Sequence, residues 1–104
     1  MEQAVLVHIP LDDKTFGSDE RRNALFELED ALIEAVELAE AGEFDGNDFG
    51  QGECIFYMYS DDADALFMVI DVVLKEFPIA KGGYAIKRYG PATDPESKEV
   101  RVTW

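Results

Sequence analysis

The stretch EFDGNDFGQGECIFYMYSDDAD, residues 43–64, decides how the chain folds. Residues 53–59 (ECIFYMY) combine two tyrosines with Phe and Ile, a composition typical of a β-strand. The acidic residues and glycines before them predict a weaker strand at 43–48 and a tight turn after it. Asp61 or Asp62 then caps a helix. The stretch therefore predicts a β-hairpin followed directly by a helix.

The front half of this stretch has some features of ion-binding loops, but its spacing argues against both common kinds. With Asp45 as position one of a calcium loop, Asn47 and Gly50 fit positions three and six. Positions five and twelve are Phe49 and Phe56, so the bidentate carboxylate is missing. A phosphate cradle needs a helix N-terminus after its glycines, whereas a strand follows here. We therefore interpret the segment as part of a hairpin in which the glycines meet the backbone geometry.

Apolar periodicity places the other elements. Residues 4–9 (AVLVHI), 84–89 (YAIKRY) and 99–104 (EVRVTW) predict strands, with a Gly/Pro/Asp-rich loop at 90–98. Ser18 predicts the N-cap of a long amphipathic helix that Gly42 ends, and Pro78 ends the second helix. The expected inward positions are Leu25, Leu28, Leu32, Val36 and Ala39 in the first helix and Ala63, Leu66, Phe67, Ile70, Val73, Leu74 and Phe77 in the second.

The resulting order is strand–helix–strand–strand–helix–strand, with one additional strand. This order predicts an α+β fold, the ferredoxin-like βαββαβ sandwich, as a single domain over residues 1–104 with an additional C-terminal edge strand. Right-handed crossovers place both helices on one face of an antiparallel sheet. We expect the strands at 4–9 and 53–59 to be central and parallel to each other. The strand at 43–48 then lies beside 53–59, and 84–89 lies between 4–9 and 99–104.

Charge and composition exclude several classes of partner. The net charge is −14, and it is uneven: residues 1–74 contain 19 acidic and three basic residues, residues 75–104 four acidic and six basic ones. This charge repels phosphates, so we expect neither nucleic acid nor a membrane as partner, whereas a basic protein is favoured. Cys54 is the only cysteine, and the N-terminus MEQAVLVHIPL has no signal-peptide features, so we expect a cytoplasmic location.

A carboxylate cluster follows from the expected parallel strands. If the strands at 4–9 and 53–59 run in the same direction, the residues that follow them meet at one rim of the sheet. That rim is a candidate site for a divalent cation. The alternative is that two of its aspartates cap helices and the others are solvated. The five residues are Asp12, Asp13, Asp61, Asp62 and Asp64.

The sheet face turned away from the helices is the predicted binding surface. Side chains alternate along a strand, so if Val5, Val7 and Ile9 face the helices, Leu6 and His8 face away. The same alternation places Cys54, Phe56, Met58, Tyr84 and Ile86 inward, and Ile55, Tyr57, Tyr59, Lys87 and Tyr89 outward. Such an apolar surface predicts a partner or ligand, and we expect a homodimer. The expected binding residues are His8, Tyr57, Tyr59, Lys87, Tyr89 and Arg101.

One basic patch and one histidine are the remaining candidates for chemistry. Lys87, Arg88 and Arg101 either hold an anion, such as the acidic half of a second molecule, or balance local charge. His8 is the only histidine, which excludes a multi-histidine metal centre, and no motif supplies the carboxylate that would orient it as a general base. Cys54 has no cationic neighbour in sequence and is expected to be buried. We expect no catalytic residue and no cofactor.

Three segments resemble a known group of proteins. FDGNDFGQGE, YSDDADALF and GGYAIKRYG are similar to the pattern of a family of short, acidic bacterial proteins. The resemblance covers residues 25–89 best and implies the ferredoxin-like arrangement. It implies no activity, cofactor or catalytic residue, because the family is functionally uncharacterised. The family often has a histidine where this chain has Asn47, which argues further against metal binding by that loop.

Three functions follow, in order of preference. The first is a non-catalytic protein-interaction or regulatory domain, in one version an immunity-type protein that neutralises a basic toxin. The second is a sensor that binds a small molecule on the tyrosine-rich face or in the dimer crevice. An enzyme ranks last, because the sequence offers no nucleophile–base pair, metal triad or cofactor fingerprint.

Overall fold

The computed structural model describes residues 1–104 and contains five β-strands, two α-helices and one short 3₁₀-helix. Along the chain these are β1 (Gln3–Pro10), α1 (Asp19–Leu38), β2 (Glu43–Gly50), β3 (Glu53–Ser60), α2 (Ala63–Glu76), η1 (Pro78–Ala80), β4 (Tyr84–Arg88) and β5 (Glu99–Val102). Every strand and α-helix expected from the sequence is present. The 43–64 stretch forms the predicted hairpin, with Gln51 and Gly52 (φ 53° and 82°) in its turn.

Both helices begin at predicted caps. The Arg21 N–H donates to Ser18 Oγ at 3.2 Å, and the Ala65 N–H donates to Asp62 Oδ1 at 3.1 Å. The fully buried residues of α1 are Leu25, Leu28, Leu32 and Val36, and those of α2 are Ala63, Leu66, Ile70 and Leu74. The periodic apolar stripes therefore face the core, and Phe67, Val73 and Phe77 are partly buried against it. The inward position expected for Ala39 is wrong, because α1 ends at Leu38 and Ala39 is exposed.

The end of α1 differs from the prediction. The sequence predicts that Gly42 ends this helix, but α1 stops at Leu38, and Glu40, with φ 49°, adopts a left-handed conformation. Gly42 instead lies where the chain passes close to the backbone of Tyr59.

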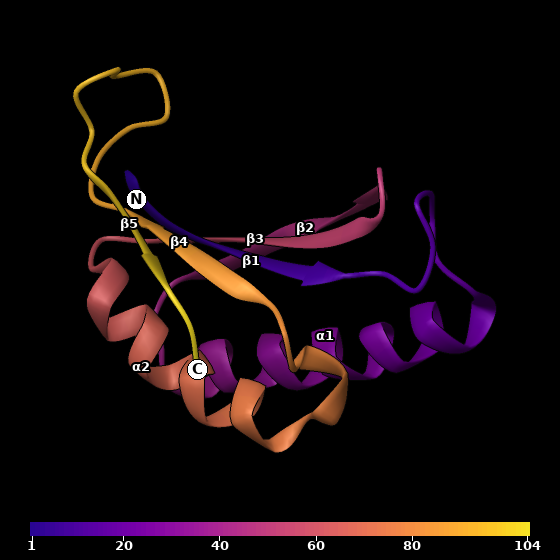
Figure 1. Ribbon diagram of the computed structural model, residues 1–104. Helices are drawn as coiled ribbons and strands as arrows, with labels where there is room; N and C mark the ends of the chain where they lie inside the picture. The colour runs from indigo at the N-terminus through magenta and orange to yellow at the C-terminus, as the bar shows by residue number, and fades with distance from the viewer.

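The five strands form one sheet in the order β2-β3-β1-β4-β5, and every neighbouring pair is antiparallel. Figure 1 shows both α-helices against one face of this sheet. The expectation that β1 and β3 are parallel is wrong: Gln3 lies opposite Ser60, and Pro10 lies opposite Glu53. The crossover through α1 makes β1 and β2 parallel, and the hairpin then reverses β3 relative to both.

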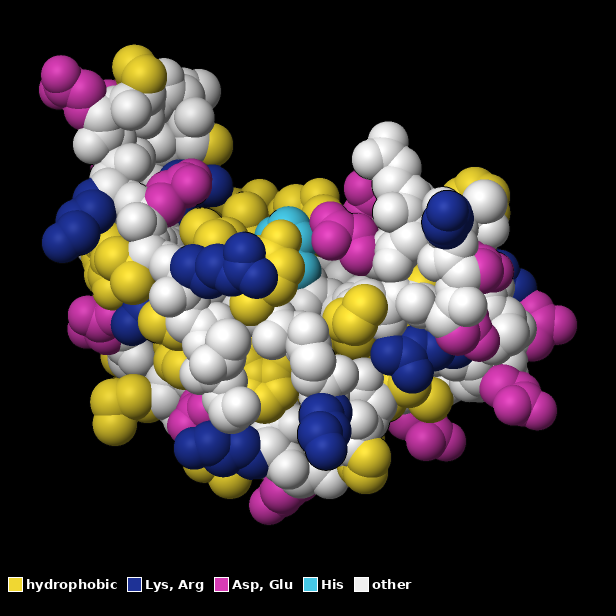
Figure 2. All heavy atoms as spheres, in the orientation of Figure 1, with side chains coloured by type: hydrophobic (Ala, Val, Ile, Leu, Met, Phe, Trp, Pro, Cys, Tyr) yellow, Lys and Arg dark blue, Asp and Glu magenta, His cyan; other side chains and the backbone are white.

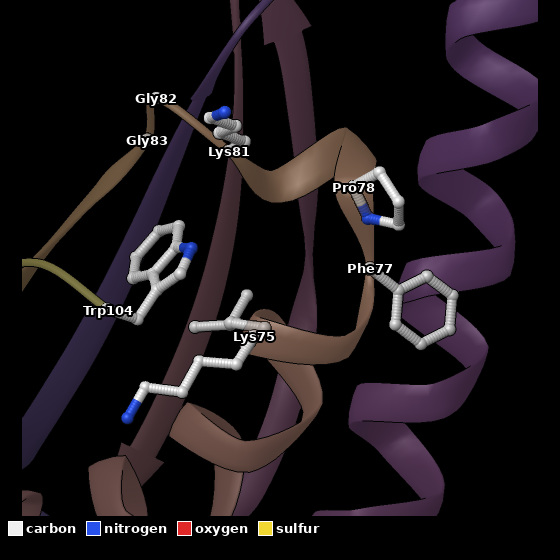
Figure 3. A pocket seen from close by; sticks show the side chains of 8 residues that line it. Lys75, Phe77, Pro78, Lys81, Gly82, Gly83 and Trp104 are labelled. Carbon is white, nitrogen blue, oxygen red and sulfur yellow. The ribbon is translucent and has the colours of Figure 1, made fainter.

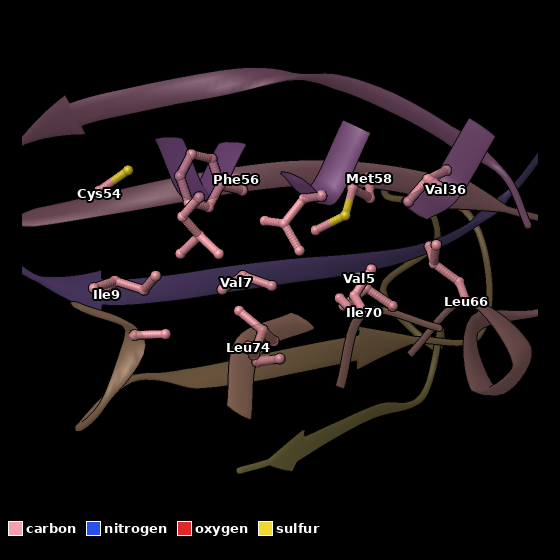
Figure 4. Packing of buried hydrophobic residues seen from close by; sticks show 14 of the residues in the cluster. Val5, Val7, Ile9, Val36, Cys54, Phe56, Met58, Leu66, Ile70 and Leu74 are labelled. Carbon is pink, nitrogen blue, oxygen red and sulfur yellow. The ribbon is translucent and has the colours of Figure 1, made fainter. Parts of the chain in front are cut away.

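The hydrophobic core lies between the sheet and the helices. Figure 4 shows alternate residues of β1 and β3 meeting side chains of the two helices. The strand residues predicted to face inward here are all fully buried: Val5, Val7, Ile9, Cys54, Phe56 and Met58. The opposite face of these two strands is therefore the one left uncovered. Neither α1 nor α2 combines the length and apolar character that a membrane-crossing helix needs.

Candidate functional site

An apolar strip runs across the uncovered side of the sheet. β1 is the middle strand, and its Leu6 stands between Tyr57 of β3 and Ile86 of β4. We call this surface the open face; it consists of Leu6, His8, Ile55, Tyr57, Tyr59, Tyr84, Ile86 and Arg101. All of these side chains are at least partly exposed. An apolar surface of this extent, with no element of the chain covering it, is the candidate functional site.

Four of the six predicted binding residues lie on the open face: His8, Tyr57, Tyr59 and Arg101. The two from the β4 segment do not, because the phase assigned to this strand is wrong by one residue. Tyr84 lies opposite His8 and Ile86 lies opposite Leu6, so both face outward. The inward residue is the fully buried Ala85. The sequence misleads here because the two large apolar residues of Tyr-Ala-Ile are outside and the small one packs on the core.

Lys87 and Tyr89 face α2 instead of the open face. The Lys87 Nζ donates to Asp64 Oδ1 at 2.9 Å, and the Tyr89 hydroxyl donates to the same oxygen at 2.6 Å. The Tyr89 hydrogen bond, followed by that of Lys87, holds the pKa of Asp64 below its usual value. The same contacts raise the pKa of Lys87 and of Tyr89. This cluster ties the end of β4 to the first turn of α2, which is a structural role.

We expect Asp64→Asn to destabilise the fold at neutral pH and to have a smaller effect in acid. Because the folded state lowers the pKa of Asp64, its stabilisation is complete above the unfolded-state pKa of about 3.9 and is lost as the pH falls through the folded-state pKa. Urea unfolding of both proteins at about pH 7 and about pH 3 measures the difference in free energy of unfolding. A difference that persists unchanged in acid would contradict this assignment. Asp30→Asn removes an exposed carboxylate with no hydrogen bond and should resemble wild type throughout.

The predicted acidic rim does not form. With β1 antiparallel to β3, Asp12 and Asp13 follow the end of β1 that lies beside Glu53. The other three aspartates (Asp61, Asp62 and Asp64) follow the opposite end of β3, beside Gln3. No group of three or more His, Cys, Asp or Glu side chains is arranged to hold a metal ion. The expectation that the five aspartates share one rim is therefore wrong, because β1 and β3 run in opposite directions.

The aspartates of the expected rim serve local structure instead. Asp12 accepts hydrogen bonds from the Ser18 hydroxyl and N–H at 2.6 and 2.9 Å, and Asp13 accepts from the N–H groups of Thr15 and Gly17. These bonds lower the pKa of Asp12 and of Asp13. The alternative interpretation, in which these carboxylates satisfy turns and caps, fits this geometry.

A row of four side chains crosses one end of the open face. His8 Nδ1 lies 3.1 Å from Glu53 Oε1, and the imidazole stacks on Tyr84 with ring centroids 4.6 Å apart and planes 7° apart. The Arg101 guanidinium carbon lies 3.7 Å from the centroid of the Tyr84 ring. Because β4 lies between β1 and β5, the tyrosine stands between the imidazole and the guanidinium.

Glu53 is the orienting carboxylate that the sequence did not reveal. An ionised carboxylate only accepts hydrogen bonds, so Nδ1 of His8 carries the hydrogen and Nε2 is free to accept one in the neutral ring. No buried side-chain nitrogen or oxygen lacks a partner, so Nε2 reaches solvent. The sequence would have predicted this contact if β1 and β3 had been taken as antiparallel. In that arrangement Ile55 lies opposite His8, and Glu53 points to the same side of β3 as Ile55. No hydroxyl or thiol group forms a hydrogen bond with the imidazole, so no candidate nucleophile is paired with His8.

The two flanks of the open face differ in charge. On the β2–β3 side the outward residues include Glu43, Asp48 and Glu53, whereas the β4–β5 side has Arg88 and Arg101, with Glu99 beside Arg88. Figure 2 shows the histidine among hydrophobic side chains, with acidic groups on one side of it and basic groups on the other. The buried Arg88 donates through Nε to the Gly90 carbonyl at 2.8 Å and has no carboxylate partner. The open face is therefore negatively charged along its β2–β3 edge and carries two arginines along its β4–β5 edge.

The open face is a broad trough without an enclosed cavity. In Figure 1 the loop between β4 and β5 and the tip of the β2–β3 hairpin both rise on the side away from the helices. The four pockets of the molecule lie elsewhere, at the ends of the helices and beside Tyr89. A surface of this shape suits a protein partner better than a small molecule.

Cys54 is unsuited to nucleophilic chemistry. Its side chain is fully buried in the core. Burial, together with the nearby Glu29, Asp48 and Glu53 carboxylates, raises the pKa of the thiol to about 12. The expectation of a small buried residue is confirmed.

Comparison of the chain with protein-family models, curated proteins and solved structures gave no match.

Proposed function

We propose that this chain is a non-catalytic protein-interaction domain that pairs with a second copy of itself through the open face. The observation that carries the proposal is the uncovered apolar strip of Leu6, Tyr57 and Ile86 between two flanks of opposite charge. Two sheets that pack face to face form a core about 10 Å thick, which would remove this strip from water.

A two-fold axis parallel to β1 makes the open face complementary to itself. Rotation about this axis lays β3 of one copy on β4 of the other, and β2 on β5. Leu6 then meets its own copy, and Tyr57 meets Ile86 of the second copy, because both lie opposite Leu6 in the sheet. An axis perpendicular to the strands would instead stack each charged flank on itself, which is unfavourable.

The same rotation brings Arg101 of each copy over β2 of the other. Arg101 shares its row of the sheet with Gly46, and Asp48 is the outward residue two positions further along β2. Each copy would thus contribute one arginine and one acidic flank, so every dimer would contain this contact twice. Opposite charges on the two flanks favour this pairing over one in which each flank stacks on its own copy.

The order of elements and strands supports assignment of the chain to the ferredoxin-like sandwiches, a group that can bury this sheet face against a second copy. The likeness to the family of short acidic bacterial proteins stays a proposal of kinship and adds no activity. A cytoplasmic location likewise stays a prediction.

Light scattering of the wild type at micromolar and higher concentrations should give twice the 11.7 kDa mass of one chain. Tyr57→Asp places a charge at the centre of the strip and should give the mass of one chain, with the circular dichroism spectrum unchanged. Met68→Asp is the matched control, because Met68 is 74% exposed on the outer side of α2, and it should leave the mass doubled. A wild type that stays at 11.7 kDa would contradict the proposal.

A second candidate partner is a basic protein, which this chain would bind as an immunity-type protein binds a basic toxin. It is favoured by an exposed acidic stripe on α1, with Glu27, Asp30, Glu34 and Glu37 spaced three or four residues apart and outside all five ion pairs. Like charges at this spacing weaken a helix, and a basic surface would relieve the repulsion. Binding through this stripe should weaken steeply with salt and persist in Tyr57→Asp.

A further inference from the structure

A pocket on the other side of the sheet has a composition unlike the rest of this acidic chain. It has a volume of about 260 Å³ and lies where the end of α2 and the loop into β4 meet Trp104, the second residue after β5. Leu74, Phe77, Pro78 and Trp104 supply its apolar walls, and Lys75 and Lys81 supply its charge. No Asp or Glu side chain lines it, although the net charge is −14.

The two lysines differ in whether a carboxylate of the chain neutralises their charge. Lys75 Nζ lies 3.0 Å from Asp71 Oδ2, one helical turn away on the same helix. Lys81 has no ion pair within the chain and is exposed. The pocket therefore presents at least one uncompensated cation, in the segment of the chain that carries a positive net charge.

Trp104 forms a wall that the backbone holds in place. A Cβ at Gly83 would lie 3.0 Å from two atoms of the indole ring and 2.5 Å from the His8 carbonyl oxygen, so only glycine allows this approach. Figure 3 shows the nitrogen-bearing edge of the indole turned toward the side of the pocket with Pro78 and Lys81. The indole N–H makes no side-chain hydrogen bond within the chain, and no buried side-chain nitrogen lacks a partner. The N–H therefore reaches solvent, where a ligand can accept its hydrogen.

We propose that this pocket binds a small aromatic carboxylate. The indole and the apolar walls would contact the ring, and the carboxylate would accept hydrogen bonds from Lys81 and the Trp104 N–H. The volume is just below the roughly 300–1,000 Å³ of typical ligand pockets, which limits the ligand to a single ring with a short acidic group. The proposal is independent of the open face, because its lining residues lie on the helix side of the sheet and its occupant is not a second copy.

Trp104 is the only tryptophan, so its fluorescence reports directly on the pocket. Titration with benzoate should change the emission saturably, and isothermal calorimetry should give the same affinity. Benzamide, which has the same shape without the charge, should bind at least about tenfold more weakly. Inorganic phosphate, which has charge without an apolar body, should also bind at least about tenfold more weakly.

Two variants locate the site. Lys81→Gln should weaken benzoate binding at least about tenfold, whereas Lys98→Gln, which removes an equal charge from the exposed loop before β5, should not change it. The proposal is overturned if neither method detects benzoate, if benzamide or phosphate binds as well, or if the two lysine variants lose affinity equally. None of these readouts depends on the oligomeric state, so the proposal and the dimer can fail separately.

Discussion

Replacing Gly42 with alanine should lower the free energy of unfolding by about 3 kcal/mol, against a total of roughly 5–15 kcal/mol for a single domain. A Cβ at this position would lie 2.2 Å from the backbone oxygen of Tyr59 and 3.1 Å from the Cβ of Ser60. Both groups are fixed: the Tyr59 carbonyl belongs to β3, and the Ser60 hydroxyl donates to the Ala41 carbonyl at 2.7 Å. The α1–β2 connection therefore has to move away from the sheet.

Gly50→Ala is the matched control for this prediction. Its added Cβ would have the Cε1 atom of Phe16 as nearest neighbour at 4.0 Å, an ordinary contact, so stability should change by less than about 0.5 kcal/mol. Urea unfolding followed by circular dichroism measures both variants. Equal effects at the two glycines would show that loss of glycine itself, rather than the close approach to Tyr59, determines the result.

The features that sequence predicted well are those set by neighbours in the chain. The apolar spacing of α1 and α2, the Ser18 and Asp62 caps and the hairpin turn all depend on residues within a few positions of each other. Alternation in β1 and β3 also identified the core correctly, because both faces of these strands have distinct compositions.

The features that sequence missed depend on pairing between distant segments. The direction of β3 relative to β1 determines whether the aspartates of the expected rim lie together. Because the two strands are antiparallel, Asp12 and Asp61 lie at opposite ends of the sheet. The phase of β4 depends on its register with β1, and Ala85 gave no apolar signal strong enough to set it. The contact between His8 and Glu53 joins residues 45 positions apart, so no local motif contains it.

Reversing one charge on each flank should break the proposed dimer, and mixing the two variants should restore it. In Arg101→Glu, an acidic residue would face Asp48 of the second copy; in Asp48→Arg, two arginines would face each other. The contact occurs twice in a symmetric dimer, so each variant alone should dimerise at least about a hundredfold more weakly than wild type. In the mixed dimer both contacts again pair opposite charges.

Sedimentation equilibrium of the two variants, separately and as an equimolar mixture, tests the self-complementary open face most directly. The expected result is the 11.7 kDa mass of one chain for each variant alone and twice that mass for the mixture, with an affinity within about tenfold of wild type. A mixture as weakly associated as its components, or variants that dimerise as well alone as together, would contradict the proposed pairing.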